Sequence, residues 1–426
     1  MKTEQWQAYM ETKEWYTKLC DLYSEKNAEA QKQRYRDLSR SFSEIFGTEI
    51  EGIRAFSSPG RTEIGGNHTD HNYGKVLTGS IDLDTICFAA PTDDGVFRIH
   101  DVTYKEDFSL SIDDTDKRPG ERGAIALVRG ILKGFSDRGL RVGGLRACVT
   151  SSVISAAGVS SSASFEMLVC AILDHFHNNG SVPKSTYALI GQSAENVYWD
   201  KKSGLLDQTA CAVGGLVTID FENPIQPALR KLDKDFSDYG YSLVIVNTGG
   251  NHADLSEDYS AIPTEMKAVA ACFGKSVLRE ITLEELMTQA ASVRAQTGDR
   301  AVLRALHFLE ENERVDREVA ALDRNDFPAF LREITSSGDS SWKWLQNCYC
   351  PGEVKEQEIV YALALTDLYI RKKDIVGACR VHGGGFAGVI MAILPKETTA
   401  DYMSFICNAG MTPYLMNVRK QGAVAL

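Results

Sequence analysis

An unusual group of polar residues lies in the stretch GRTEIGGNHTDHNYGK, residues 60–75, directly after an extended apolar segment. Arg61, His68, Asp70 and His71 are placed there among four glycines. An ordinary loop does not require so many polar side chains in one place, whereas a site for a polar ligand does. The stretch therefore predicts a binding site for a polar small molecule.

A second stretch, SSVISAAGVSSSASFEM at residues 151–167, lies between a predicted strand and a predicted helix. Apart from Val159, its residues from Ala156 to Ser162 are small, so backbone N–H groups can come close to a ligand. The positive end of the following helix would point at the same place, which favours a phosphate loop. A serine-rich N-cap leading into a buried helix is the structural alternative. No Gly-Lys-Ser/Thr follows, so this is not a Walker A loop and its cation must come from elsewhere.

Two acidic residues lie in apolar surroundings, where a solvated acid is not expected. Glu195 is part of the predicted helix GQSAENVYWD, and Asp207 is part of the segment SGLLDQTACAVGG. A buried carboxylate costs free energy unless it is paired or used, so both residues are candidates for metal binding or proton transfer. A local helix cap or a core salt bridge remains the alternative for each of them.

A third glycine-rich stretch, HGGGFAG at residues 382–388, formally matches the G-x-G-x-x-G pattern of dinucleotide-binding sites. That pattern requires a helix directly afterwards. Here VIMAILP follows, a β-branched run that ends at Pro395 and predicts a strand. We therefore expect a tight glycine turn between strands and no dinucleotide site.

The elements that would position these residues change type along the chain. Residues 1–48 are charged, carry apolar residues at helical spacing and predict one or two amphipathic helices. Short β-type runs follow, among them VLTGSIDL and TICFAAP, which predict two separate strands. Helices and strands then mix without regular βαβ order, which favours an α+β fold in two domains. Pro224 and Pro227 mark a connection. We expect an N-terminal helical extension over residues 1–48, a first domain over 49–225 and a second domain over 226–426.

Composition and charge exclude several classes of protein. The chain has 426 residues, 43% of them apolar, and a net charge of −12, which argues against a nucleic-acid partner because phosphates demand a basic surface. Neither a signal peptide nor an apolar run of the ~18 residues that span a membrane is visible, so no membrane partner is expected. The ten cysteines are scattered without zinc-type spacing and fit free thiols in a cytoplasmic protein.

Taken together and in this order, four stretches resemble the motifs of the GHMP kinase superfamily, in particular its galactokinase branch. They are SSPGRTEIGGNHTDHNYGKVL, SSVISAAGVSSSASFE, AENVYWDKKSGLLDQTACAVGG and VHGGGFAGVIMAIL. The resemblance spans about residues 50–420 and leaves most of the first 48 residues outside. It implies a two-domain fold with the active site in the cleft between the domains, and a sugar, ATP and Mg²⁺ as ligands.

The resemblance also implies a role for individual residues. Asp207 matches the acid that accepts, or supports removal of, the proton of the sugar hydroxyl, and Arg61 matches the arginine that faces it and stabilises the transferred phosphoryl group. Arg61 beside Asp207 would keep that acid ionised at neutral pH. Ser162 and Glu195 match Mg²⁺ ligands. The implied sugar contacts are Asn67, His68, Asp70 and Tyr259, and the implied ATP contacts are Ala156, Ala157, Gly158, Val159, Ser160, Ser161, Ser162, Gly384 and Gly385.

The chain departs from the family pattern in the signature loop. The usual Glu before the histidine, itself a sugar-hydroxyl contact, is replaced by Asn67, which can still donate and accept hydrogen bonds. The usual Val-Asn-Leu-Ile-Gly after the arginine is here TEIGG, so Glu63 and Gly65 are unusual. In the second motif Ser155 stands where a Gly is common. These changes indicate a divergent branch and an open sugar preference.

Three functions remain in competition at this point. The first is an ATP-dependent kinase that phosphorylates the anomeric hydroxyl of galactose or a close relative. The second is a kinase of the same superfamily for a different sugar, such as an amino sugar or arabinose. The third is a non-catalytic sensor that binds ATP and sugar and signals through a partner protein. Residues 1–48 could serve such a partner, but packing onto the first domain is the favoured interpretation.

Overall fold

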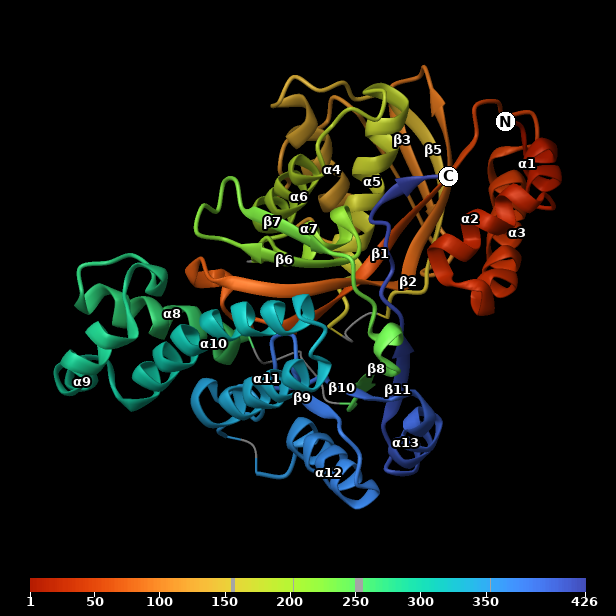
Figure 1. Ribbon diagram of the computed structural model, residues 1–426. Coiled ribbons are helices and arrows are strands. Elements are labelled where there is room, and N and C mark those ends of the chain that lie inside the picture. The colour runs from red at the N-terminus through yellow and green to blue at the C-terminus, as the bar shows by residue number, and fades with distance from the viewer. Residues whose placement is uncertain (155–157, 202, 250–255, 353) are drawn as a thin grey trace.

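The computed structural model describes residues 1–154, 158–201, 203–249, 256–352 and 354–426, and the described strands form two sheets (Figure 1). The larger sheet has eight strands in the order β12-β1-β2-β5-β3-β4, with β6 paired to β2 and β7 to β6. Its strands are β1 (Arg54–Gly65), β2 (Lys75–Thr92), β3 (Val96–Asp101), β4 (Glu106–Ser111), β5 (Gly144–Ser151), β6 (Leu216–Asp220), β7 (Ala228–Leu232) and β12 (Val424–Ala425).

Both faces of this sheet are covered, and the alternation of residues along β2 shows how. Cys87 and Ala89 point into a core shared with the helices that follow β4, whereas Ile86 and Phe88 point into a core shared with the N-terminal helices. Successive side chains of a strand face opposite sides, so a strand covered on both faces is apolar throughout. The helices on the first face are α4 (Ala124–Ser136), α5 (Ser161–His177), α6 (Lys184–Ser193) and α7 (Leu206–Val213).

The N-terminal extension is built from three helices, α1 (Thr3–Tyr9), α2 (Lys13–Tyr23) and α3 (Glu25–Phe46). Their aromatic side chains pack on the sheet: the ring centroids of Trp6 and Phe88 are 5.1 Å apart. The Trp6 indole also donates a hydrogen bond to the carbonyl of Ile53 at 2.9 Å. The extension thus packs onto the larger sheet, as the sequence favoured.

The smaller sheet has four antiparallel strands in the order β11-β8-β10-β9. They are β8 (Tyr241–Asn247), β9 (Ala378–His382), β10 (Val389–Pro395) and β11 (Thr412–Met416), and the helices beside them are α11 (Phe327–Ser340), α12 (Glu358–Lys373) and α13 (Lys396–Asn408). One core contains Leu77 and Ile81 of β2 together with Ile245 of β8 and Met391 of β10. The two sheets therefore share buried apolar surface.

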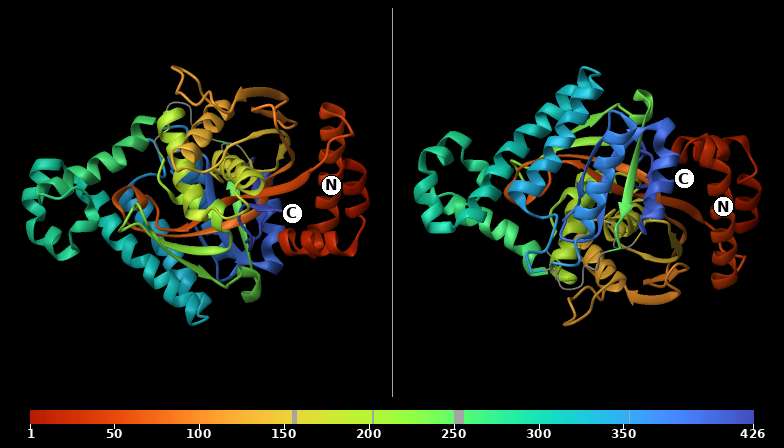
Figure 2. Two further views of the ribbon diagram at one scale, coloured as in Figure 1. Left: turned by 90° about the horizontal axis from the view of Figure 1, so that it is seen from above. Right: turned by 90° about the horizontal axis from the view of Figure 1, so that it is seen from below.

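A helical arm extends from the molecule on the side opposite to the N-terminal helices, as both views in Figure 2 show. It consists of α8 (Ser256–Cys272), α9 (Leu283–Thr297) and α10 (Asp299–Asp323), whose apolar faces form a core of their own. The short helices are η1 (Asp70–Asn72), η2 (Ala194–Tyr198), η3 (Phe236–Tyr239), η4 (Leu278–Glu280) and η5 (Ser341–Leu345).

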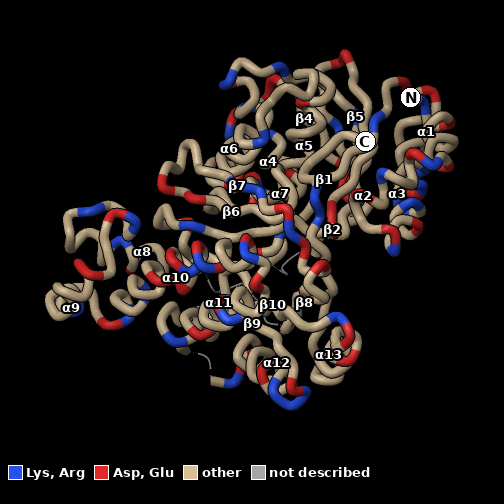
Figure 3. Tube along the Cα trace, viewed as in Figure 1, with Lys and Arg blue, Asp and Glu red and all other residues tan. Residues whose placement is uncertain are grey.

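Several expectations can now be compared with the structure. The mixed α and β fold is confirmed, and HGGGFAG lies between the antiparallel strands β9 and β10 rather than before a helix. The proposed boundary at 225/226 falls inside the β6–β7 hairpin, so the larger sheet continues to Leu232; the division into domains remains a prediction. Acidic and basic residues are interspersed along the described chain (Figure 3). Within the described residues, no helix is long and apolar enough to cross a membrane.

Candidate active site

The centre of the candidate site is a partly buried ion pair between Arg61 of β1 and Asp207 in the first turn of α7. The Arg61 Nε–H donates to Asp207 Oδ1 at 2.8 Å, and Arg61 Nη2 lies 2.7 Å from the same oxygen. Burial would raise the pKa of Asp207, but the Arg61 charge and a hydrogen bond from the Ser160 hydroxyl hold that pKa below its usual value. Asp207 is therefore an ionised carboxylate at neutral pH.

The described end of the predicted phosphate loop is joined to this ion pair. β5 ends at Ser151 and α5 begins at Ser161, as the strand–loop–helix pattern predicted. The Arg61 backbone N–H donates to the carbonyl of Val159 at 3.1 Å, and the Arg61 guanidinium donates to the carbonyl of Gly158. The first N–H groups of α5 have no partner within the helix, so this end of it suits an anion. Ala156 and Ala157 lie outside the described residues.

The two predicted metal ligands are in direct contact. The Ser162 hydroxyl donates to Glu195 Oε1 at 2.6 Å, and the other oxygen, Oε2, accepts from Gln208 Nε2 at 3.0 Å. The Glu195 side chain is only 1% exposed and projects from η2, a single π-helical turn of the kind often found at functional sites. The Lys201 ammonium contacts both ligands, at 3.0 Å from Ser162 Oγ and 2.5 Å from Glu195 Oε1. Sequence reasoning missed this lysine.

The signature loop places its histidines against a tyrosine from α8. His68 Nε2 lies 2.9 Å from the carbonyl oxygen of Gly384, and the centroids of the His68 and Tyr259 rings are 5.2 Å apart. Burial, together with His71, lowers the pKa of His68 to about 3, so this imidazole is neutral. A Cβ on Gly384 would lie 2.5 Å from Tyr259 Cε2. The turn between β9 and β10 can therefore approach the Tyr259 ring because Gly384 has no side chain.

Asp70 lies on the same loop and faces a glycine that sequence reasoning did not single out. A Cβ on Gly204 would lie 1.8 Å from Asp70 Oδ2, so any larger residue there would push this carboxylate from its position. The Tyr259 hydroxyl lies 3.3 Å from His71 Nε2 of the signature loop, and burial with the charges of Asp70 and Asp207 raises the pKa of Tyr259. Arg61, the partner of Asp207, lies on β1, which ends at Gly65 directly before that loop. The phosphate-loop residues and the signature-loop residues thus belong to one site.

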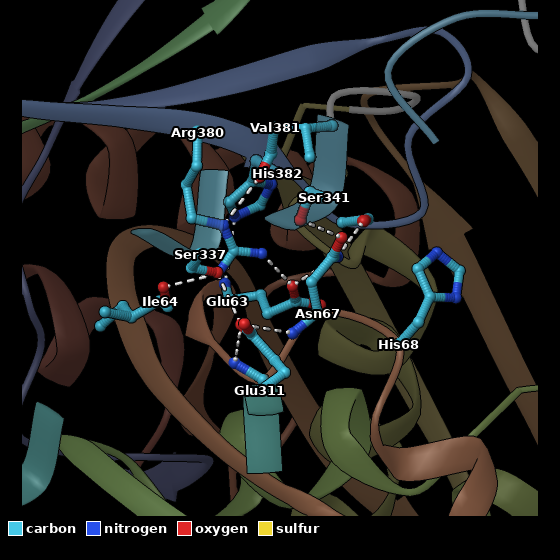
Figure 4. A network of polar contacts seen from close by, with 12 residues as sticks. Glu63, Ile64, Asn67, His68, Glu311, Ser337, Ser341, Arg380, Val381 and His382 are labelled. Carbon is cyan, nitrogen blue, oxygen red and sulfur yellow. Dashed lines mark hydrogen bonds and ion pairs between the residues drawn. The ribbon is translucent and has the colours of Figure 1, made fainter. Parts of the chain in front are cut away.

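Asn67 is fully buried, and its amide makes four hydrogen bonds within the protein (Figure 4). Its Nδ2 group donates to Glu63 Oε1 at 2.9 Å and to the carbonyl of Gly383 at 2.8 Å. Its Oδ1 accepts from Ser341 at 3.2 Å and from Asn347 at 2.9 Å. An amide offers two donor and two acceptor positions, so the hydrogen-bonding capacity of this side chain is fully used.

Glu63 connects this network to the smaller sheet. Arg380 of β9 lies 2.7 Å from Glu63 Oε1 and donates a second hydrogen bond to the carbonyl of Ile64 at 2.7 Å. The Glu63 backbone N–H donates to His382 Nε2 at 3.0 Å. Strand β1 of the larger sheet is therefore tied to β9 of the smaller one beside the signature loop. In the sequence, the acidic Glu63 within a predicted strand could have signalled a buried ion pair. Its partner Arg380 lies more than 300 residues further along the chain.

Comparison with known proteins identifies the family. The family model "Galactokinase galactose-binding signature" matches residues 40–91, and the model "GHMP kinases N terminal domain" matches residues 126–215. A galactokinase from Actinobacillus pleuropneumoniae is 31% identical over 366 residues, which cover 84% of this chain and 89% of the relative. This chain belongs to the galactokinase family. A galactokinase from the dog, Canis lupus familiaris, is 30% identical over 404 residues, with 91% of this chain and 95% of that protein covered.

Solved structures agree with the family assignment at the level of the fold. A galactokinase from Lactococcus lactis, complexed with galactose, matches with a TM-score of 0.78 at 23% identity and covers 92% of this chain and all of that one. A mevalonate kinase from Methanococcus jannaschii matches with a TM-score of 0.62 at 14% identity, over 87% of this chain and 99% of that one. The expected GHMP-kinase-like fold is confirmed. As a galactokinase-family member the protein is a sugar kinase, a transferase, and GHMP kinases use ATP.

Proposed function

We propose that this protein transfers the γ-phosphate of MgATP to the anomeric hydroxyl of galactose. The observation that carries the proposal is the partly buried contact between Arg61 and Asp207 at the end of the phosphate loop. Phosphoryl transfer asks the protein mainly for positioning and for stabilisation of charge. An ionised acid, a fixed guanidinium and the N-terminal end of α5 supply both in one place.

In this mechanism Asp207 accepts the proton of the attacking sugar hydroxyl. Its carboxylate is ionised, and the hydrogen bonds from Arg61 and Ser160 fix its orientation. Arg61 keeps its positive charge throughout and stabilises the negative charge on the transferring phosphoryl group. The loop from Ala156 to Ser162, with Gly384 and Gly385 from the smaller sheet, is proposed to hold the ATP phosphates.

Ser162 and Glu195 fit a magnesium ion by their chemistry. A hydroxyl and a carboxylate oxygen are hard donors, and they lie in contact at the start of α5. Among the described residues no three His, Cys, Asp or Glu side chains are grouped to hold a metal. That agrees with the usual Mg²⁺ site, which takes one or two protein oxygens plus phosphates and waters. When bound, Mg²⁺ would neutralise charge on the phosphates.

The sugar is proposed to lie between the signature loop and Tyr259. Asp70 and the Nδ1 of neutral His68, unpartnered among the described residues, offer acceptors, because the His68 Nε2–H donates to the carbonyl of Gly384. The Tyr259 hydroxyl offers both a donor and an acceptor, as sugar hydroxyls require. One observation favours a second candidate, a kinase for a related sugar such as arabinose or an amino sugar. The amide of Asn67 is fully occupied inside the protein, at the position where the family carries a sugar contact. We further propose a cytoplasmic location, where its free cysteines stay reduced.

The test is ADP formation from MgATP with galactose, N-acetylgalactosamine, arabinose and glucose as acceptors. We expect turnover with galactose, and Asp207→Asn should lower its rate by roughly 10²-fold or more, because the proton acceptor is lost. Asp323→Asn is the matched control, because Asp323 forms a surface ion pair with Arg230. Near-normal turnover of Asp207→Asn would contradict the assignment of the acid. Turnover with another sugar only would favour the second candidate.

A further inference from the structure

Lys201 occupies a position that the proposed function leaves unexplained. Its ammonium lies 3.0 Å from Ser162 Oγ and 2.5 Å from Glu195 Oε1, the two oxygens proposed to hold Mg²⁺. The three groups form a closed triangle, because the Ser162 hydroxyl also donates to Glu195 Oε1 at 2.6 Å. A single positive charge thus contacts both proposed metal ligands.

The carboxylate of Glu195 is arranged so that one oxygen faces this cation. Oε2 is held from inside by Gln208, whose amide also contacts the buried Glu166. Oε1 faces Ser162 and Lys201. A carboxylate that is 1% exposed requires a compensating positive charge. In this structure Lys201 provides that charge.

Lys201 is anchored at its backbone, and about half of its side chain is exposed to solvent. The Lys201 backbone N–H donates to the carbonyl of Glu195 at 3.0 Å, which fixes the start of the side chain beside the acid. The side chain itself is 46% exposed, and its ammonium lies 5.3 Å from the centroid of the Trp199 ring. A long flexible lysine chain can therefore leave the two oxygens without a rearrangement of the backbone.

We propose that Lys201 is a resident cation that competes with the metal and makes metal binding depend on the nucleotide. This inference rests on the proposed function of Ser162 and Glu195 as metal ligands. A metal ion that binds without nucleotide must displace the Lys201 ammonium from the Glu195 carboxylate, and the ammonium is then left without a partner. A metal that arrives with ATP brings phosphate oxygens that can accept the displaced ammonium. Free Mg²⁺ should therefore bind poorly, and MgATP well.

The test measures metal binding without turnover. Mn²⁺ serves as the probe for the magnesium site and is titrated by calorimetry into the full chain, first without nucleotide. Lys201→Met should bind Mn²⁺ about tenfold or more tightly than the wild type, because no charged hydrogen bond to Glu195 has to be broken. Lys201→Arg keeps the positive charge and should stay near the wild type. Lys133→Met, which removes an exposed lysine paired with Asp137, is the matched control and should not change.

Two further measurements separate the outcomes. Adding Glu195→Gln to Lys201→Met should abolish the gain in Mn²⁺ affinity, which ties the gain to this site. Thermal stability should rise with added Mn²⁺ more in Lys201→Met than in the wild type, since the metal then replaces the missing charge. If Lys201→Met and the wild type bind Mn²⁺ equally well while the wild type phosphorylates galactose, this inference is overturned and the proposed function still stands. Absence of both turnover and metal binding with an ATP analogue would overturn the proposed function.

Discussion

At the scale of single residues, the charge state of Asp207 is set by its neighbours rather than by its own chemistry. Burial raises the pKa of this carboxyl, and the guanidinium of Arg61 outweighs that effect together with the hydrogen bond from Ser160. Because the pKa is depressed, the acid stays ionised as the pH falls to its usual value of 3.8 and loses its charge only below it. Arg61 thus prepares the acid for proton transfer as well as facing the phosphoryl group.

This balance predicts the pH dependence of the reaction. For the wild type, Asp207 should cause no loss of kcat/KM between about pH 8 and about pH 5. In Arg61→Met the largest effect opposing burial is lost, so the pKa of Asp207 rises and the acid limb of the residual activity moves to higher pH. The measurement is kcat/KM for galactose against pH in both proteins. Coincident acid limbs would show that Arg61 does not control this carboxyl.

At the scale of elements, the signature loop is held by a network that crosses from β1 to β9. Glu63 and Arg380 form a buried ion pair, and the amide of Asn67 donates to the same Glu63 oxygen that Arg380 contacts. Removing one partner of a buried pair leaves the other charge uncompensated, which costs much more than losing an exposed pair. The geometry of the loop therefore depends on a contact between two distant strands.

Glu63→Gln should lower the free energy of unfolding by about 3 kcal/mol, because it leaves Arg380 without its carboxylate. Glu313→Gln, in a strongly exposed pair with Arg317, should change it by about 0.5 kcal/mol or less and serves as the control. The double variant Glu63→Gln/Asn67→Asp again has one carboxylate and one amide at positions 63 and 67. Its free energy of unfolding should therefore fall by about 1 kcal/mol less than the sum of the losses in Glu63→Gln and Asn67→Asp. Urea unfolding is measured for the wild type, both single variants, the double variant and the Glu313→Gln control. Strict additivity would contradict a shared network.

Local sequence patterns predicted most of the helices, strands and turns near the site, but not the side-chain contacts between them. The strand–loop–helix around Ser161 and the turn at Gly383 follow from glycine, serine and β-branched residues within a few positions. The segments VLTGSIDL and TICFAAP looked like two strands. They form the single strand β2, whose pairing with β1 shifts register between Ser80 and Asp84 without ending the strand. The Glu63–Arg380 pair and the ammonium of Lys201 could not be predicted, since such contacts depend on the packing of the whole chain.

At the scale of the whole molecule, one buried carboxylate joins three distant parts of the chain. Asp84 of β2 lies 2.5 Å from Arg34 of α3 and 2.9 Å from Arg419 near the C-terminus, and it also accepts hydrogen bonds from Tyr23 and Ser57. Burial would raise the pKa of Asp84, but the two arginines hold it below its usual value. The N-terminal extension is thus fixed to the larger sheet by charge as well as by aromatic packing.

Asp84→Asn should destabilise the fold by about 3–5 kcal/mol at neutral pH, because the buried guanidinium of Arg419 and the partly buried one of Arg34 lose their carboxylate. A carboxyl with a depressed folded pKa contributes stability above its unfolded value of 3.8 and loses it as the pH falls through the folded pKa. The variant should therefore show a weaker loss of stability below about pH 4 than the wild type. Unfolding free energy against pH tests this, with the exposed Asp37→Asn as control. Parallel curves for the wild type and Asp84→Asn would contradict it.

We propose above that the enzyme transfers phosphate to the anomeric oxygen of galactose with the help of Asp207 and Arg61. The most direct measurement is the ³¹P NMR spectrum of the product formed from MgATP and galactose by the wild type and by Asp207→Asn. The proposal predicts a single sugar phosphate on the anomeric oxygen with the wild type, and roughly 10²-fold less of it in the same time with the variant. A phosphate on another hydroxyl, or equal product from both proteins, would contradict the claim.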